Sequence, residues 1–421
     1  MTDLARKILG LAAADPGGAL AWLDGGEGRG WIGLEPGLCV EADSLAPLAE
    51  IEALWRAQPE FVWIGHLSYE VGSEALLARS QRRGRLAGLC MRRYQAVLEL
   101  GPTPRMHGSA RAGTRLMACL DAAVPEDMVD QTWPLGPLRA RWSADVYRAK
   151  VRAAQALITA GETYQVNLTQ AFAASWTAAW ARRPLAARAA AVYGASRGAT
   201  PATMGALLAG AEGRGSPLWV LSNSPETLLA VEFADGGDIA RSWPIKGTRP
   251  RGARPGGDSA AAAELLASEK DLAEHVMIVD LVRNDLGQLA VPGTVEAPRR
   301  PAIVSLPTVH HLVSEVRCRL RRGWTMHGLL AAMFPGGSIT GAPKRRTAEI
   351  IGALEERPRG LYCGAIVVLA PDGLRCSIPI RTGELDADGL SVQSGGGIVI
   401  DSDPEAERLE CWAKVRAFDR G

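Results

Sequence analysis

The chain has 421 residues, of which 47% are hydrophobic and 22% charged, a balance typical of a folded globular protein with one large domain or two ordinary ones. A net charge of +1, with basic residues spread along the chain, argues against nucleic acid as a partner. No apolar run approaches the roughly 18 residues of a membrane span, and the N-terminus lacks a secretory signal, so we expect a cytoplasmic protein without a membrane partner.

Arginine is the usual cation of this chain, because only six residues are lysines: Lys7, Lys150, Lys246, Lys270, Lys344 and Lys414. A lysine inside a glycine-rich polar motif therefore needs a chemical reason. The seven cysteines are odd in number and scattered, with no CxxC pair, which argues against a disulfide framework and against a zinc cage. We expect them to be free thiols in or near the core.

The first third of the chain predicts a mixture of short strands and helices. Residues 61–67 and 94–100 are apolar and β-branched, as strands usually are. Residues 101–140 are rich in glycine and proline without a sustained period, which favours a linker. A helix is predicted from Ser143 to Gly161.

The remainder alternates strand-like runs with alanine-rich helices, which are expected over 171–193 and 259–284. Strands are expected over 164–169, 218–222, 361–369, 375–382 and 390–400. Because the last three strands follow one another without intervening helices, the pattern predicts an α+β fold with antiparallel sheets and helices against them.

An acidic helix is predicted over residues 269–286. Asp271, Glu274 and His275 lie three or four residues apart and share one of its sides. Taken alone, this pattern favours a solvated acidic face. A second acidic cluster near the C-terminus makes a metal site the alternative.

That second cluster follows three glycines, 395–397, and a short apolar strand. Asp403 stands where a helix N-cap belongs, and Glu407 and Glu410 are about one turn apart on the helix that follows. Magnesium prefers hard oxygen ligands and commonly takes one or two protein carboxylates. One carboxylate from each helix, Glu274 and Glu410, would form such a site, although spacing alone does not bring them together.

Two further segments offer groups that could bind an anion. The glycine-rich run 334–344 precedes a predicted helix, and exposed N–H groups at a helix start favour anions. It departs from a Walker loop because Ala342 stands where that motif needs lysine, and a structural glycine turn is the alternative. Arg381 is expected inside a strand, where its planar fork suits a carboxylate and an internal salt bridge is the alternative.

Lys246 precedes Gly247, whose missing side chain lets backbone approach a ligand. A lysine desolvated in such a pocket can lose its proton near neutral pH and act as a nucleophile, whereas an arginine cannot. This chemistry would explain a lysine in a chain so rich in arginine. A surface lysine in a turn is the alternative.

Taken in order, nine runs within residues 140–420 resemble the chorismate-utilising family that includes anthranilate, aminodeoxychorismate and isochorismate synthases. The runs are YQVNLT, SNSPE, PIKGT, EHVMIVDLVRNDL, PTVHHLVS, GGSITGAPK, RGLYCGAI, IPIRT and GGGIVIDSDPEAE. We therefore expect residues 141–421 to be a chorismate-binding catalytic region. Residues 1–140 match more loosely and are expected to be an N-terminal α+β region integrated into the same fold.

The resemblance implies two large, mainly antiparallel sheets packed together with helices outside. It also implies Mg²⁺ held by Glu274 and Glu410 and bridging to the ring carboxylate of chorismate. The implied substrate-binding groups are Gly247, Thr248, Tyr362, Arg381 and the N–H groups of Gly395, Gly396 and Gly397, with Gln165, His311 and Ser338 as neighbours.

The chemistry that the resemblance implies is covalent. Lys246 adds to the ring at C2 while the C4 hydroxyl leaves with a proton from Glu226, and ammonia then attacks C4 and expels the lysine. PIKGT resembles the branch that makes 4-amino-4-deoxychorismate, since anthranilate synthases usually carry alanine in place of this lysine. Gln165 argues against the isochorismate branch, which has a lysine at that position.

The chain carries no recognisable glutaminase sequence, so the resemblance implies that a separate glutamine amidotransferase subunit delivers the ammonia, with folate synthesis as the expected pathway. Two alternatives remain. One is a sister enzyme that makes anthranilate or another chorismate product. The other is a catalytically silent binding subunit, which the intact set of Glu226, Lys246, Glu274 and Glu410 disfavours.

Overall fold

The computed structural model describes residues 3–14, 20–26, 28–77, 82–122, 132–211, 218–252, 255–306 and 309–420. Within these residues, seventeen strands are joined into one hydrogen-bonded ladder and three more form a small separate sheet. Neighbouring strands pair antiparallel throughout both. No helix in this part of the chain is long and apolar enough to cross a membrane.

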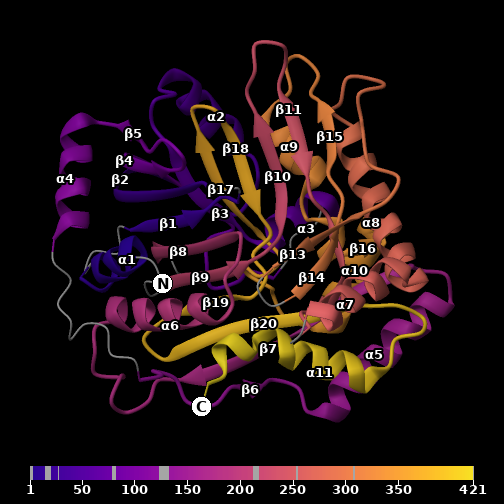
Figure 1. Ribbon diagram of the computed structural model, residues 1–421. Coiled ribbons are helices and arrows are strands. Elements are labelled where there is room, and N and C mark those ends of the chain that lie inside the picture. Colours follow the sequence, from indigo (N-terminus) through magenta and orange to yellow (C-terminus); the bar gives the residue numbers. More distant parts are fainter. Residues whose placement is uncertain are drawn as a thin grey trace.

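The ladder consists of two groups of strands that run in different directions in Figure 1. The first group has the order β6 (Arg139–Ala140), β7 (Gln165–Ser175), β20 (Gly389–Ile398), β19 (Thr382–Leu385), β9 (Leu218–Ser224), β8 (Met204–Ala211), β1 (Ala21–Asp24) and β2 (Gly30–Ala42). The second continues through β4 (Leu89–Leu100), β3 (Trp63–Leu67), β17 (Ala365–Ala370), β18 (Gly373–Ser377), β10 (Thr227–Glu232), β11 (Ile239–Ser242) and β15 (Val316–Arg319). At the margins, β5 (Arg105–Gly108) pairs with β4, and β16 (Gly341–Ala342) pairs with β7.

The two groups of strands pack against each other. One buried cluster joins Leu23 of β1 and Val220 of β9 to Ile64 of β3 and Val368 of β17. A larger cluster fills the space between the outer faces of the strands and the helices. The predicted α+β fold of packed antiparallel sheets with helices outside is therefore confirmed, and β1 to β4 from the first 140 residues are part of the same ladder.

Helices cover the outside of the strands. They are α1 (Asp3–Ala13), α2 (Leu48–Ala57), α3 (Tyr69–Leu77), α4 (Ala110–Asp121), α5 (Ala144–Thr159), α6 (Leu185–Ala199), α7 (Pro255–Ala267), α8 (Glu269–Gly287), α9 (Met326–Met333), α10 (Lys344–Glu355) and α11 (Pro404–Val415), with short 3₁₀ turns η2 (Gly337–Ile339) and η3 (Arg416–Phe418). The small sheet of β12 (Ile245–Pro250), β14 (Val309–Val313) and β13 (Ala302–Ser305) packs against α7 and α8, whereas α11 lies along β20 (Figure 1).

Local capping determines where the two helices nearest the C-terminal strands begin. The Ser143 hydroxyl accepts a hydrogen bond from the Val146 N–H at 3.3 Å and caps α5. The Asp403 carboxylate accepts from the N–H groups of Glu405 and Ala406 at 3.1 and 2.7 Å and caps α11. Both predicted helix starts are confirmed.

Three predicted segments differ from the structure. Residues 105–121 of the expected linker form β5 and α4, because Leu116 and Leu120 give α4 a buried stripe despite the nearby glycines; residues 123–131 of that linker lie outside the described residues. Residues 171–175, expected in a helix, belong to β7, since pairing with β20 overrides the helix propensity of alanine. The helix expected over 259–284 is interrupted at Ser268, whose hydroxyl caps α8.

Candidate active site

The Lys246 side chain on β12 lies where the small sheet meets β7. Its Nζ donates a hydrogen bond to Gln165 Oε1 at 3.5 Å. Burial lowers the pKa of Lys246, because the charged amine loses its hydration. The carboxylates of Glu274, Glu226 and Glu410 favour the charged amine and act in the opposite direction. Gln165 therefore contacts the amine and three predicted acidic residues act on it electrostatically, while burial favours its neutral form.

Glu226 is held in the turn between β9 and β10 and is only 6% exposed. Its carbonyl accepts a hydrogen bond from the Ile378 N–H at 3.0 Å, and its carboxylate accepts one from the Ser338 hydroxyl at 2.7 Å. Burial raises the pKa of Glu226, although Ser338 and Lys246 act in the opposite direction. A carboxyl with a raised pKa near an amine is suited to donating a proton.

Carboxylates from α8 and α11 approach the same amine. Glu274 on α8 and Glu410 on α11 both act electrostatically on Lys246. Glu410 forms a 2.7 Å ion pair with Lys414, and its side chain is 54% exposed. Burial raises the pKa of Glu410, but the positive charges of Lys414, Lys246 and Lys270 outweigh burial and lower this pKa overall. Because Lys270 belongs to the first turn of α8, that end of α8 lies near α11.

The three glycines of β20 let side chains of α11 and of β7 approach this strand closely. A Cβ on Gly396 would lie 2.7 Å from Glu407 Oε2 and 3.9 Å from Glu410 Oε1, and a Cβ on Gly397 would lie 2.9 Å from the Gln165 amide. The Gly395 carbonyl accepts from Lys414 Nζ at 2.8 Å. Among the described strands, only β7 pairs with β20 beyond Val392, so alternate N–H groups of this stretch face away from a partner strand.

The segment after Lys246 contains a β-bulge. The pairing of β12 with β14 shifts register between Lys246 and Thr248, and Gly247 between them has φ +74°, a conformation that glycine adopts without strain. A Cβ there would also meet Leu265 at 2.9 Å. The bulge explains why glycine follows the lysine.

His311 on β14 is buried and pairs through Nδ1 with the Thr248 hydroxyl at 2.9 Å. Its Nε2 is buried and has no hydrogen-bond partner in the described part of the protein. Burial lowers the pKa of His311, and the positive charge of Arg381 lowers it further. A neutral imidazole therefore presents an unpaired ring nitrogen near Arg381.

Arg381 does not lie in a strand, and that prediction was wrong. It stands between β18 and β19 with φ +50°, a conformation outside the extended region, and its carbonyl accepts from the Asn223 N–H at 3.1 Å. Burial lowers the pKa of Arg381. No described residue pairs with its guanidinium, so the alternative of an internal salt bridge finds no support.

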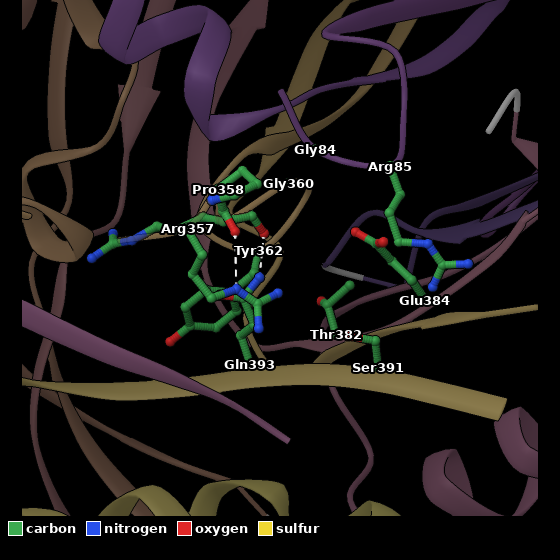
Figure 2. A pocket seen from close by; sticks show the side chains of 11 residues that line it. Gly84, Arg85, Arg357, Pro358, Gly360, Tyr362, Thr382, Glu384, Ser391 and Gln393 are labelled. Carbon is green, nitrogen blue, oxygen red and sulfur yellow. Dashed lines mark hydrogen bonds between the residues drawn. The ribbon is translucent and has the colours of Figure 1, made fainter. Parts of the chain in front are cut away.

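The predicted residues border two separate small cavities. Glu226 and Ser338 line one of about 10 Å³, close to the volume that one water molecule needs. Tyr362 lines another of about 50 Å³ together with Thr382, Gln393 and Glu384 (Figure 2). The titratable neighbours of Tyr362 are Cys363, Arg359 and Cys411, and Lys246 is not among them, so this phenol is less directly linked to Lys246 than the other candidates are.

Glu274 of α8 and Glu407 and Glu410 of α11 are the acidic residues near the predicted metal site, but in this structure their ligand atoms do not gather within 4.8 Å of one another. Glu274, Glu407 and Glu410 supply the oxygen ligands that Mg²⁺ prefers. Glu407 and Glu410 both reach the surface of Gly396, and burial raises the pKa of Glu407, which Glu410 raises further. A cation here would relieve that repulsion between neighbouring carboxylates.

Two lysines differ from what the sequence indicated. Lys344, at the end of the glycine-rich run, pairs with the buried Asp285 at 2.6 Å and ties α10 to α8, so its role is structural. Lys414 was missed, although it acts electrostatically on both Glu226 and Lys246. The available signal was its place as one of six lysines, one turn after Glu410.

Known proteins resemble this chain in sequence and in fold. Residues 31–420 match the family described as chorismate binding enzyme. An aminodeoxychorismate synthase component 1 from Salmonella typhimurium is 41% identical over 66% of this chain and 58% of its own length. An anthranilate synthase component 1 from Streptomyces coelicolor is 40% identical over 71% of this chain and 54% of its own length. This chain therefore spans little more than half the length of these relatives.

A solved structure extends the likeness to the fold. Anthranilate synthase component I from Streptococcus pneumoniae superposes with a TM-score of 0.78 over 93% of this chain and 92% of that chain, at 24% identity. At that identity the likeness concerns the fold alone.

Proposed function

Because this chain belongs to the chorismate binding enzyme family, we propose that it binds chorismate and replaces the C4 hydroxyl with an amino group, as component I of an aminodeoxychorismate synthase. The observation that carries the proposal is Lys246, a half-buried amine beside Gln165, with the carboxyl of Glu226 within electrostatic reach. The likeness to aminodeoxychorismate synthases at 41% identity supports it.

Chorismate carries two carboxylates, and the candidate site offers groups suited to anions. The Arg381 guanidinium, which has no partner among the described residues, can bind a carboxylate in two-point fashion. Thr248, the Nε2 of His311, which has no partner among the described residues, and those N–H groups of Gly395 to Gly397 that point away from β7 would supply further polar contacts. Mg²⁺ held by Glu274 and Glu410 would supply positive charge for the ring carboxylate.

The proposed reaction has two steps. The neutral amine of Lys246 attacks C2, the ring double bonds shift, and the C4–O bond breaks while Glu226 gives its proton to the departing hydroxyl, which leaves as water. Ammonia then attacks C4, the double bonds shift back, and the C2–N bond to Lys246 breaks. The covalent adduct replaces one difficult displacement by two easier steps. The proton from Glu226 converts the hydroxyl, a poor leaving group, into water.

We further propose that a separate glutamine amidotransferase supplies the ammonia. The relatives named component 1 support this, since such a name implies a second component. With an ammonium salt as the nitrogen source, the chain alone should turn over chorismate.

One assay tests the proposal: purified protein, chorismate, Mg²⁺ and an ammonium salt, with products identified by mass spectrometry. We expect 4-amino-4-deoxychorismate without pyruvate, and loss of turnover when a chelator removes the metal. Anthranilate with pyruvate would assign the sister activity instead, which relatives at 40% identity carry in their names. Absence of turnover with every nitrogen source would leave a binding subunit.

A further inference from the structure

A cluster of two cysteines and one glutamate lies on the β2–β4 pair, apart from the residues of the candidate active site. Cys39 Sγ and Cys90 Sγ are 3.7 Å apart. Glu41 Oε1 lies 3.6 Å from Cys39 Sγ and 3.8 Å from Cys90 Sγ. The three ligand atoms thus lie within 4.8 Å of one another and could hold one metal ion.

The strand register produces this cluster. Cys39 pairs with Arg92 and Glu41 pairs with Cys90, so the two cysteines are diagonal neighbours on one face of the sheet. Residues 39 and 90 are far apart in the sequence, and no local spacing indicates that their side chains meet. The expected absence of a zinc cage was based on the number and spacing of the cysteines along the sequence, which do not show this pairing.

The distances match the edges of a metal tetrahedron. With Zn–S bonds of about 2.3 Å and a Zn–O bond of about 2.0 Å at tetrahedral angles, two sulfurs lie about 3.8 Å apart and a sulfur and an oxygen about 3.5 Å apart. A disulfide suits these positions less well, since diagonal partners in a sheet lie about 7–8 Å apart, beyond the usual Cα separation of a disulfide.

The charges around the cluster also suit a cation bound by thiolates. Arg92, which donates to the carbonyls of Ala209 and Gly210, places a positive charge beside both sulfurs and favours thiolate.

We propose that Cys39, Cys90 and Glu41 form a binding site for zinc or a similar thiolate-seeking divalent cation, with water as the fourth ligand. Cys39 is exposed and Cys90 buried, so the fourth position faces solvent. The pairing of β2 with β4 shifts register between Pro36 and Cys39. A bound ion would therefore join the end of β2 to β4 just beyond this irregularity.

Cobalt is the probe for this site, because thiolate-bound Co²⁺ gives a sulfur-to-metal charge-transfer absorption. Reduced protein freed of reductant is titrated with Co²⁺. We expect the band to saturate at one ion per chain and to vanish when Zn²⁺, which binds such sites more tightly, is added. Cys39→Ser should abolish the band. The control Cys119→Ser, which removes the exposed cysteine of α4, should keep it.

Absence of the band in the native chain, or an undiminished band in Cys39→Ser, would overturn the proposal. A second measurement uses alkylation by iodoacetamide, followed by mass spectrometry of the labelled peptides. Zn²⁺ should slow labelling of Cys39 but leave labelling of Cys119 unchanged. Equal rates at Cys39 with and without zinc contradict the site, whatever the chain does with chorismate.

Discussion

Two buried polar regions that share strand β7 differ in how completely their hydrogen bonds are made. Around Arg359, which is 1% exposed, the guanidinium donates to Glu355 at 2.6 and 2.9 Å, to the Ile339 carbonyl at 2.8 Å and to the Asn167 carbonyl at 2.6 Å. Glu355 also accepts from the Thr169 N–H at 3.0 Å. This network joins α10, β7 and the glycine-rich turn with its charges paired.

The candidate active site, two residues earlier on β7, is incomplete by comparison. The amide nitrogen of Gln165 and Nε2 of His311 are buried without a partner in the described residues, and Arg381 has no described acceptor for its guanidinium. Buried polar groups normally find partners. The charges of the Arg359 network are paired within the fold, whereas on the proposed function a ligand would complete the polar groups around Lys246.

Removal of the Lys246 amine should have the largest effect, and this effect should be on the rate of amination. Lys246→Ala should lower the rate of chorismate amination by about 1,000-fold or more, because the covalent step is lost, while the Kd for chorismate changes little. Rates come from the mass-spectrometric assay and Kd from calorimetry. The control Lys7→Ala removes a lysine that pairs with Asp121 at 3.8 Å, and should keep native rates. Native rates in Lys246→Ala would exclude the covalent step.

Disruption of the satisfied network should act on stability instead. Arg359→Leu leaves the Glu355 carboxylate buried without its partner, and should lower the free energy of unfolding by about 3–5 kcal/mol. Denaturant titration measures the change. The double variant Arg359→Leu with Glu355→Leu should recover part of the loss, since no uncompensated charge remains. A single variant as stable as the native chain would show that the network does not support the fold.

Substitution of Arg381 should sharpen the difference further. Arg381→Lys keeps the charge but loses the two-point fork, and with it one charge-assisted hydrogen bond to chorismate. KM for chorismate should therefore rise about 10- to 100-fold, with a smaller change in kcat. Thermal stability should stay near that of the native chain, because this side chain has no described protein partner to lose. A strongly destabilised variant with unchanged KM would assign Arg381 a structural role.

The smallest effect is expected in the pH dependence. Ser338 donates a hydrogen bond to Glu226 and so favours its ionised form, which keeps the raised pKa of Glu226 lower than burial alone would set it. Ser338→Ala removes that donor, and the limb of the pH–rate profile that belongs to Glu226 should move to higher pH. Thr340→Ser, a mild change in the same turn, is the matched control. A shift to lower pH would contradict the assignment of Glu226 as proton donor.

Much of the local structure could be predicted from the sequence, because caps and helix starts depend on neighbouring residues. Ser143 and Asp403 cap the expected helices. Prediction failed where distant pairing outweighed local propensity, as in the alanine-rich end of β7. It also failed at Arg381, whose backbone conformation depends on the chain around it.

By itself, the sequence determined the family resemblance, the α+β class and the identity of the groups that could react, since these depend on which residues occur and in what order. Only the tertiary structure decided which of them meet. Strand register and helix packing bring Gln165 and Glu226 to Lys246, place Lys414 among them, and join Cys39 to Cys90. The physical reason is that such contacts span tens to hundreds of residues, and no local pattern encodes the register that creates them.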